Sequence, residues 1–235
     1  MTATPPSLIA HFAPQPGTHF ERARTLMVDG QVRPNKVNDP RIINAMRTLP
    51  RERFVPPGLW SVAYADEDVP LGGGRVMMEP MVIARLAQIA AIRAGDRVLV
   101  LGAGNGYGAA LFASCGAVVT AVEDDRALLA LARPALEGIA GVTLVEAPVT
   151  APPSSAAPYD IVLIEGAVAA LPAGANAWVR PGSGRLVTVL VTDGVGRGVL
   201  AETAGAAGGP LRAVPQFDCF TPALPQFMAP PAFVF

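Results

Sequence analysis

Val98-Leu99-Val100-Leu101-Gly102-Ala103-Gly104-Asn105-Gly106-Tyr107-Gly108 is the stretch that decides the fold. Its four leading apolar residues predict a strand buried on both faces. The glycines that follow let the backbone turn sharply and approach a ligand closely. A helix is expected over about 106–114, so backbone amides at its N-terminus would face that ligand. The stretch therefore predicts a strand, a ligand-binding turn and a helix.

The rest of the chain repeats this alternation of apolar strands and helices. Further strands are predicted at 118–122, 142–145, 161–164 and 185–191, with helices at 80–92, 126–138 and, weakly, 173–179. Residues 195–204 and 211–217 are expected to pair as an antiparallel hairpin. Strands that alternate with helices indicate an α/β fold with a mostly parallel sheet and helices on both faces.

The segments outside this alternation divide the chain. Residues 1–19 are predicted to be a loose arm, and 20–80 a helical cap with a loop over 54–74. In the cap, Asp39 and Pro40 open a helix whose apolar stripe ends before Pro50. Residues 81–217 form the main domain. The Pro- and Phe-rich tail, 218–235, is interpreted as a cover for the apolar sheet edge, or as a dimerisation arm or a lid.

The glycine loop favours a nucleoside cofactor. Tyr107 stands where the dinucleotide-binding fingerprint has its third glycine, which makes a dehydrogenase a distant alternative. Glu123 follows the next strand, where a carboxylate can accept both hydroxyls of a ribose. The structural alternative is that the glycines only allow the helix to pack closely against the sheet, and that Glu123 is an ordinary charged residue at the end of a strand. Loop, helix, strand and acid in this order favour the cofactor site.

Composition excludes several other classes of function. The formal net charge of -1 disfavours a general nucleic-acid binder. Two cysteines and two histidines, His11 and His19, make a disulfide framework or a catalytic metal site improbable, so no metal is predicted. The uncharged run between Arg97 and Glu123 contains too many glycines for a membrane span. A cytoplasmic location is the default expectation.

Several short motifs in order resemble one known family. Five motifs are similar to those of protein-L-isoaspartate O-methyltransferases. They are Pro50-Arg51-Glu52-Arg53-Phe54-Val55-Pro56, Ala63-Tyr64-Ala65-Asp66, the glycine loop with Gly106-Tyr107, Pro158-Tyr159-Asp160-Ile161-Val162 and Gly184-Arg185-Leu186-Val187. The resemblance covers roughly residues 20–192. It implies a Rossmann-like fold with a seven-stranded sheet and a C-terminal antiparallel hairpin, behind a helical cap.

The resemblance also implies a reaction. The expected cofactor is S-adenosylmethionine, with S-adenosylhomocysteine as its product, and the expected substrate is a protein or peptide with a free carboxylate. Such a site must align the carboxylate, exclude water and supply a few donors. The implied cofactor-binding positions are Gly102, Ala103, Gly104, Asn105, Gly106, Glu123, Asp124, Glu146 and Ala147.

The acceptor segment departs from the family's Gly-Gln-Thr-Ile-Ser-Gln-Pro. This chain has Gly74-Arg75-Val76-Met77-Met78-Glu79-Pro80, so Val76 and Met78 stand at the usual hydroxyl positions. Arg75 is expected to pair with Glu79 or to grip the substrate. On the cofactor side, Val100 replaces an acid, and Ala147-Pro148-Val149 replaces a Gly-Asp-Gly, with Glu146 as a candidate substitute.

Three hypotheses therefore stay open. The first is a carboxyl methyltransferase of the isoaspartate type. The second is a methyltransferase whose altered 75–79 segment receives another acceptor. The third is a non-catalytic binding or scaffold protein that keeps the fold. A homodimer formed through the Phe-rich tail is a further expectation.

Overall fold

The computed structural model describes residues 16–153, 157–203 and 209–227 of the 235-residue chain. Its centre is a seven-stranded sheet in the order β5-β4-β3-β6-β7-β8-β9. The strands are β3 (Arg97–Leu101), β4 (Val118–Glu123), β5 (Val142–Glu146), β6 (Ile161–Val168), β7 (Arg185–Thr192), β8 (Val195–Thr203) and β9 (Leu211–Asp218). β3 to β7 run parallel, and β8 and β9 complete an antiparallel meander. The expected fold class is confirmed.

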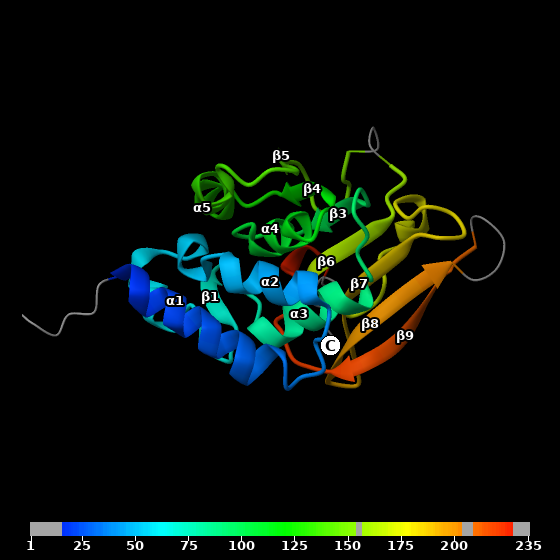
Figure 1. Ribbon diagram of the computed structural model, residues 1–235. Helices are drawn as coiled ribbons and strands as arrows, with labels where there is room; N and C mark the ends of the chain where they lie inside the picture. The colour runs from blue at the N-terminus through cyan, green and yellow to red at the C-terminus, as the bar shows by residue number, and fades with distance from the viewer. Residues whose placement is uncertain (1–15, 154–156, 204–208, 228–235) are drawn as a thin grey trace, which may run out of the picture.

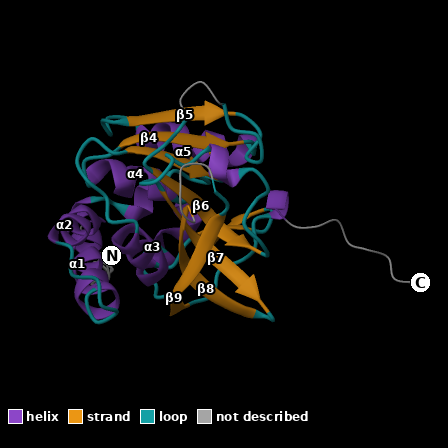
Figure 2. Ribbon diagram, turned by 90° about the vertical axis from the view of Figure 1, so that its right-hand side faces the viewer, coloured by secondary structure: helices purple, strands orange, loops and turns teal. Residues whose placement is uncertain are grey.

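Helices pack mainly on one face of this sheet. They are α3 (Pro80–Ile89), α4 (Tyr107–Ser114) and α5 (Arg126–Leu136), and α1 (Pro16–Met27) and α2 (Pro40–Thr48) lie beyond them. Figure 2 shows α1, α2 and α3 together on one side of the strands. Asp39 caps α2 by accepting from the Arg41 N–H at 2.9 Å, as its sequence position predicts.

The other face is covered differently from expectation. Both right-handed crossovers through α4 and α5 lie on the first face, because β3, β4 and β5 step in one direction. The return from β5 to β6 contains no α-helix among its described residues. The predicted helix over 173–179 is only a 3-10 turn, Ala175–Ala177. Its proline and glycine flanks, Pro172 and Gly174, explain why no longer helix forms.

The cap holds structure that the sequence pattern did not predict. Residues 54–74 are not a plain loop, since β1 (Val69–Gly72) pairs with β2 (Arg75–Met77) as an antiparallel hairpin. Two short 3-10 helices, Arg51–Phe54 and Pro57–Val62, and a π-helical turn, Val28–Val32, complete the cap. Gly72, Gly73 and Gly74 all have positive φ, which lets so short a hairpin turn.

The core follows the alternation of strand side chains. Val98 and Val100 point into the helix-covered core, whereas Leu99 and Leu101 point into the smaller second core. Leu224, from the end of the described chain, belongs to that second core. In Figure 1 this red C-terminal segment passes behind α3 toward β6. The tail therefore reaches the centre of the molecule.

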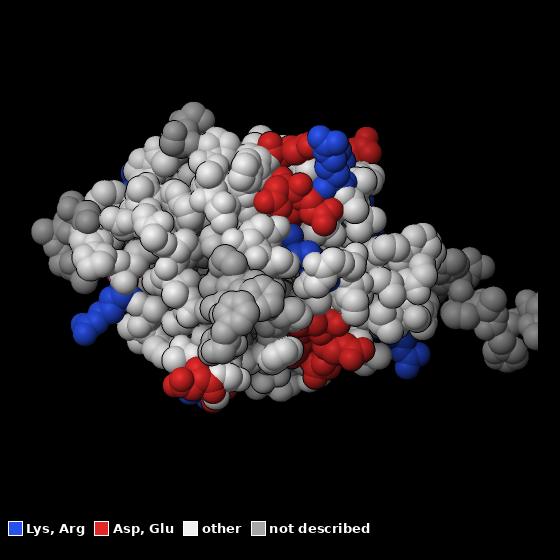
Figure 3. Space-filling model, turned by 180° about the vertical axis from the view of Figure 1, so that it is seen from behind, with Lys and Arg blue, Asp and Glu red and all other residues white. Residues whose placement is uncertain are grey.

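The surface carries its charges in small groups. Figure 3 shows separate acidic and basic clusters on the face opposite to that of Figure 1, with uncharged surface over most of the area. No helix in the described part of the chain is long and apolar enough to cross a membrane.

Candidate active site

The glycine loop lies at the point where the strand order reverses. β3 has β4 on one side and β6 on the other, and chain crossovers leave it in opposite directions. Open α/β sheets bind ligands in the crevice at the carboxyl ends of such strands. Gly102, Gly104 and Gly106 all have positive φ, with values of 67°, 57° and 88°. The loop thus adopts a backbone path that favours glycine at each of these positions.

Neighbouring residues fix the loop in place. The Ala103 N–H donates to the Val122 carbonyl at 3.0 Å. Asn105, which is 1% exposed, donates through Nδ2 to the Phe54 carbonyl at 2.8 Å and accepts from the Tyr107 N–H at 3.2 Å. Asn105 therefore ties the cap to the start of α4, and its side chain is committed to the protein.

Glu123 lies where the sequence places it, but its carboxylate is already fully bound. Three backbone amides donate to it, from Gly104 at 2.7 Å and from Asp124 and Asp125 at 3.0 Å each. Arg75 adds a bidentate pair at 3.1 and 3.0 Å. Glu123 is 0% exposed, so a ribose would have to displace one of these partners.

Arg75 does not pair with Glu79, one of its two expected partners, but with Glu123. Its Nη2 also donates to the Gly102 carbonyl at 2.8 Å, and only 5% of its surface is exposed. The guanidinium reaches across to the glycine loop and away from Glu79. The other expectation, that Arg75 grips a substrate carboxylate, stays a prediction. A planar fork with several donors fits this buried carboxylate better than a flexible ammonium would.

The remaining predicted cofactor positions lie near Glu123 but at the surface. Asp124 accepts from the Val149 N–H at 3.3 Å and from Gln226 Nε2 at 2.7 Å. Glu146 is exposed and forms ion pairs with Arg126 and Arg133. The Ala147 N–H donates to the Glu123 carbonyl at 3.1 Å.

The acceptor segment divides into half-buried and buried positions. Met78 is 1% exposed and belongs to the helix-side core, and its carbonyl accepts from Arg51 Nη2 at 2.9 Å. Val76 is half-buried and lines a cavity of about 10 Å³. Glu79 is also half-buried, and burial first, then Asp66 and Asp68, raises its pKa to about 7.

Glu165 is the main residue of this site that sequence reasoning missed. It follows the apolar run of β6, is 7% exposed and lines the same cavity as Val76. Burial raises the pKa of its carboxyl to about 8, although Arg75 and the Gly108 N–H pull it down. Its Oε2 has no hydrogen-bond partner among the described residues. A carboxyl that ends a buried apolar run was the available signal.

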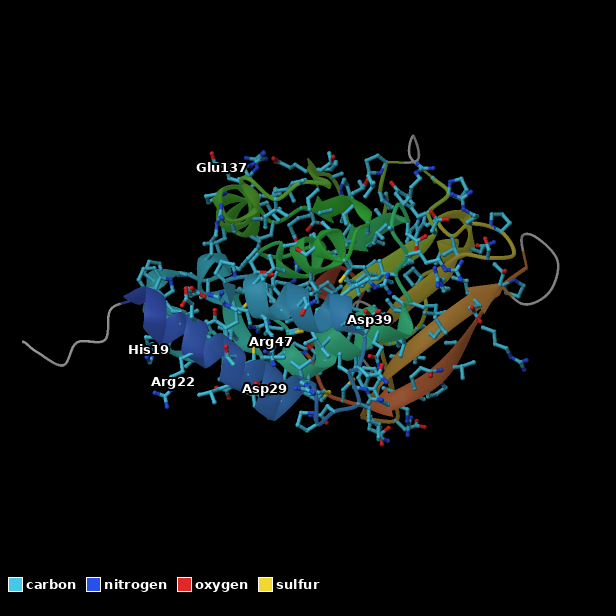
Figure 4. All side chains as sticks on the ribbon, in the orientation of Figure 1. His19, Arg22, Asp29, Asp39, Arg47 and Glu137 are labelled. Atoms are coloured by element: carbon cyan, nitrogen blue, oxygen red, sulfur yellow. The ribbon has the colours of Figure 1, made fainter. Side chains whose placement is uncertain are left out.

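The other polar groups lie apart from the crevice. His19 and Arg22 lie on α1, and Arg47 of α2 pairs with Asp29 at 2.5 Å (Figure 4). His11 falls outside the described residues. Within the described ranges, no group of three or more His, Cys, Asp or Glu side chains could hold a metal ion.

The glycine loop and the carboxylate at the end of β4 suit an adenosyl cofactor, but the cavity beside them is too small for one. Positive-φ glycines and a carboxylate at the end of β4 are the donor and acceptor set that a nucleoside requires. That carboxylate is saturated, and the adjoining cavity of about 10 Å³ is far below the about 300–1,000 Å³ that is typical of cofactor sites. The conformation described here therefore has no room for S-adenosylmethionine.

The fold and the glycine-loop crevice define a Rossmann-like methyltransferase, and comparison with known proteins names the family. The family model of protein-L-isoaspartate(D-aspartate) O-methyltransferase matches residues 23–194. The chain belongs to this family, whose cofactor is S-adenosylmethionine. A protein-L-isoaspartate O-methyltransferase of Methylorubrum extorquens is 39% identical over 166 residues, 70% of this chain and 72% of the relative.

A second relative supports the family, and a solved structure supports the fold. A relative of the same name from Methanoculleus marisnigri is 38% identical over 64% of this chain and 70% of its own length. A Plasmodium falciparum structure of this family in complex with S-adenosyl-L-homocysteine has a TM-score of 0.70 at 16% identity, covering 86% of this chain and 98% of that one. At that identity the likeness establishes the fold.

Proposed function

We propose that this chain is an S-adenosylmethionine-dependent carboxyl methyltransferase that acts on isoaspartyl residues of proteins. The observation that carries the proposal is the family match over 23–194. The glycine loop after β3 and the Glu123 carboxylate at the end of β4 support it. We place its action in the cytoplasm. The homodimer expected through the tail stays a prediction, because residues 221–227 pack on their own chain and 228–235 lie outside the described residues.

The acceptor side needs donors for a carboxylate that is already ionised. When bound, the cofactor supplies an electrophilic methyl group on a sulfonium. Glu123 would hold the ribose of a bound cofactor, and Arg75, released from Glu123, would hold the substrate carboxylate. Glu165 lines the same cavity and, while protonated, offers a neutral O–H donor. Together they replace the hydroxyls that Val76 and Met78 lack.

A direct assay tests this proposal. Transfer of labelled methyl groups is measured to an isoaspartyl peptide and to the aspartyl peptide of the same sequence, with methanol release in base identifying the ester. Transfer to the isoaspartyl peptide alone is expected. Transfer to other proteins but to neither peptide would favour the second hypothesis, another acceptor, which the apolar Val76 and Met78 support.

Val76→Thr is expected to raise the rate of methyl transfer to the isoaspartyl peptide about tenfold. Threonine keeps the shape of valine and suits a strand, while its hydroxyl adds one donor to a charged acceptor. Val214→Thr, on exposed β9, is the matched control and should leave the rate unchanged. An unaltered rate in Val76→Thr would place the acceptor elsewhere.

A further inference from the structure

The end of the described chain crosses the carboxyl ends of β3 and β6. We call residues 221–227 the strap. The Ala167 N–H donates to the Pro222 carbonyl at 3.0 Å, and the Leu224 N–H donates to the Ala167 carbonyl at 2.8 Å. Ala223 forms a parallel bridge with Ala167. Figure 2 shows the short helix that ends the strap (Pro225–Phe227) on the side toward which the β4 and β5 arrows point.

Leu224 fills the space above two glycines of the crevice. Its side chain is 2% exposed. A Cβ placed on Gly102 would lie 3.1 Å from both Leu224 methyl groups, and a Cβ on Gly166 would overlap the same side chain. Glycine at both positions therefore accommodates a leucine from the chain itself. In an open site the same bare backbone would accommodate a ligand.

The strap also engages the rim of the predicted ribose site. Gln226 Nε2 donates to Asp124 Oδ1 at 2.7 Å, one residue beyond Glu123. Together with Arg75, the strap leaves a cavity of about 10 Å³, lined by Gly74, Arg75, Val76, Glu165, Gly166 and Pro222–Leu224. Cofactor sites typically measure about 300–1,000 Å³. Leu224 and the Arg75 guanidinium both lie against Gly102, in space that a ligand at the glycine loop would enter.

The attachment of the strap is small enough to be reversible. Two backbone hydrogen bonds, one side-chain bond and two buried residues, Thr221 and Leu224, hold it, and the residue before it, Phe220, is 74% exposed. β9 ends at Asp218, so detachment of the strap leaves the paired strands intact. Local openings of this kind lie well below global unfolding in free energy.

We propose that the strap is an autoinhibitory segment that closes the adenosyl site and competes with the cofactor for it. The inference rests on the proposed function, since it supplies the regulation of that site. A ligand that binds only the open state has its affinity lowered by the fraction of molecules that are open. Weakening the strap should therefore tighten cofactor binding.

The test is a calorimetric titration of full-length variants with S-adenosylhomocysteine. Leu224→Glu places a charge that cannot stay buried, so the strap is expelled, and binding should tighten at least tenfold. Phe220→Ala, in the exposed residue just before the strap, is the control and should bind as the unaltered protein does. Leu224→Ala is a milder change and is also expected to tighten S-adenosylhomocysteine binding. It serves as the test variant if Leu224→Glu does not fold.

Hydrogen exchange supplies a second measurement on the unaltered chain. The Leu224 amide is bonded to Ala167, so saturating S-adenosylhomocysteine should speed its exchange. Equal affinity in folded Leu224 variants and the unaltered protein, including no binding by either, would overturn the autoinhibition proposal. Tighter binding without methyl transfer to any isoaspartyl peptide would uphold the strap and contradict the proposed function instead.

Discussion

Arg75→Met is expected to lower the free energy of unfolding by about 3–5 kcal/mol, measured by denaturant titration. The variant leaves the wholly buried carboxylate of Glu123 without its cation. Three backbone amides still donate to the carboxylate, but they carry no net charge to balance it. Removing one member of a buried pair is costly for this reason, even where the intact pair adds little net stability.

A surface pair provides the matched control for this prediction. Arg133 and Glu146 are 3.3 Å apart, with side chains 59% and 46% exposed. Arg133→Met should change stability by less than about 1 kcal/mol, because water already solvates both charges. A loss in Arg75→Met as small as that of the control would mean that Arg75 does not stay on Glu123 in solution.

Arg75→Met also tests whether the Arg75–Glu123 pair keeps the cofactor site closed. A cofactor ribose and Arg75 compete for one carboxylate, so the stability that the pair adds to the closed form opposes binding. Arg75→Met should therefore combine lower stability with tighter S-adenosylhomocysteine binding. A variant whose fold is merely damaged would lose both stability and affinity for S-adenosylhomocysteine.

The sheet was predictable because its strands are short apolar runs bounded by glycine and charge. Val98 to Leu101 and Ile161 to Ile164 fall within β3 and β6. The glycine loop was predictable for the same reason, since its backbone path requires glycine at 102, 104 and 106. Local sequence sufficed wherever local conformation decided the outcome.

The contents of the crevice were not predictable, because they depend on contacts between distant segments. Arg75 lies 48 residues from Glu123, and either Glu79 or a substrate was an equally reasonable partner. Leu224 reaches Gly102 and Gly166 only through the path of the tail. Sequence reasoning kept a lid among its alternatives for the tail, but nothing local indicated which crevice the tail would cover.

Glu165→Gln is expected to stabilise the protein at alkaline pH and to leave it unchanged near pH 4. Burial raises the pKa of the Glu165 carboxyl to about 8, whereas an exposed glutamate ionises near 4.3. Between these values the folded state holds a proton that the unfolded state has released. Stability therefore falls as pH rises through this window, and the full penalty is present above pH 8.

Glutamine keeps the size of the side chain and cannot ionise, so this part of the pH dependence should disappear. Unfolding free energies compared at pH 5 and pH 8.5 should show a gain on the order of 2–4 kcal/mol for the variant at the higher pH only. Glu202→Gln, in an exposed residue of β8, is the control and should follow the unaltered protein at both values. Parallel curves for Glu165→Gln and the control would show that Glu165 is hydrated in solution.

The acceptor role of Glu165 adds a second outcome to the same variant. Above pH 8 the unaltered carboxyl ionises, loses its donor and repels a substrate carboxylate across the cavity that it lines. Methyl transfer to an isoaspartyl peptide should then fall in the unaltered protein while the Glu165→Gln amide continues to donate. If both rates fell together, Glu165 would act on stability alone, and the acceptor donors would reduce to Arg75.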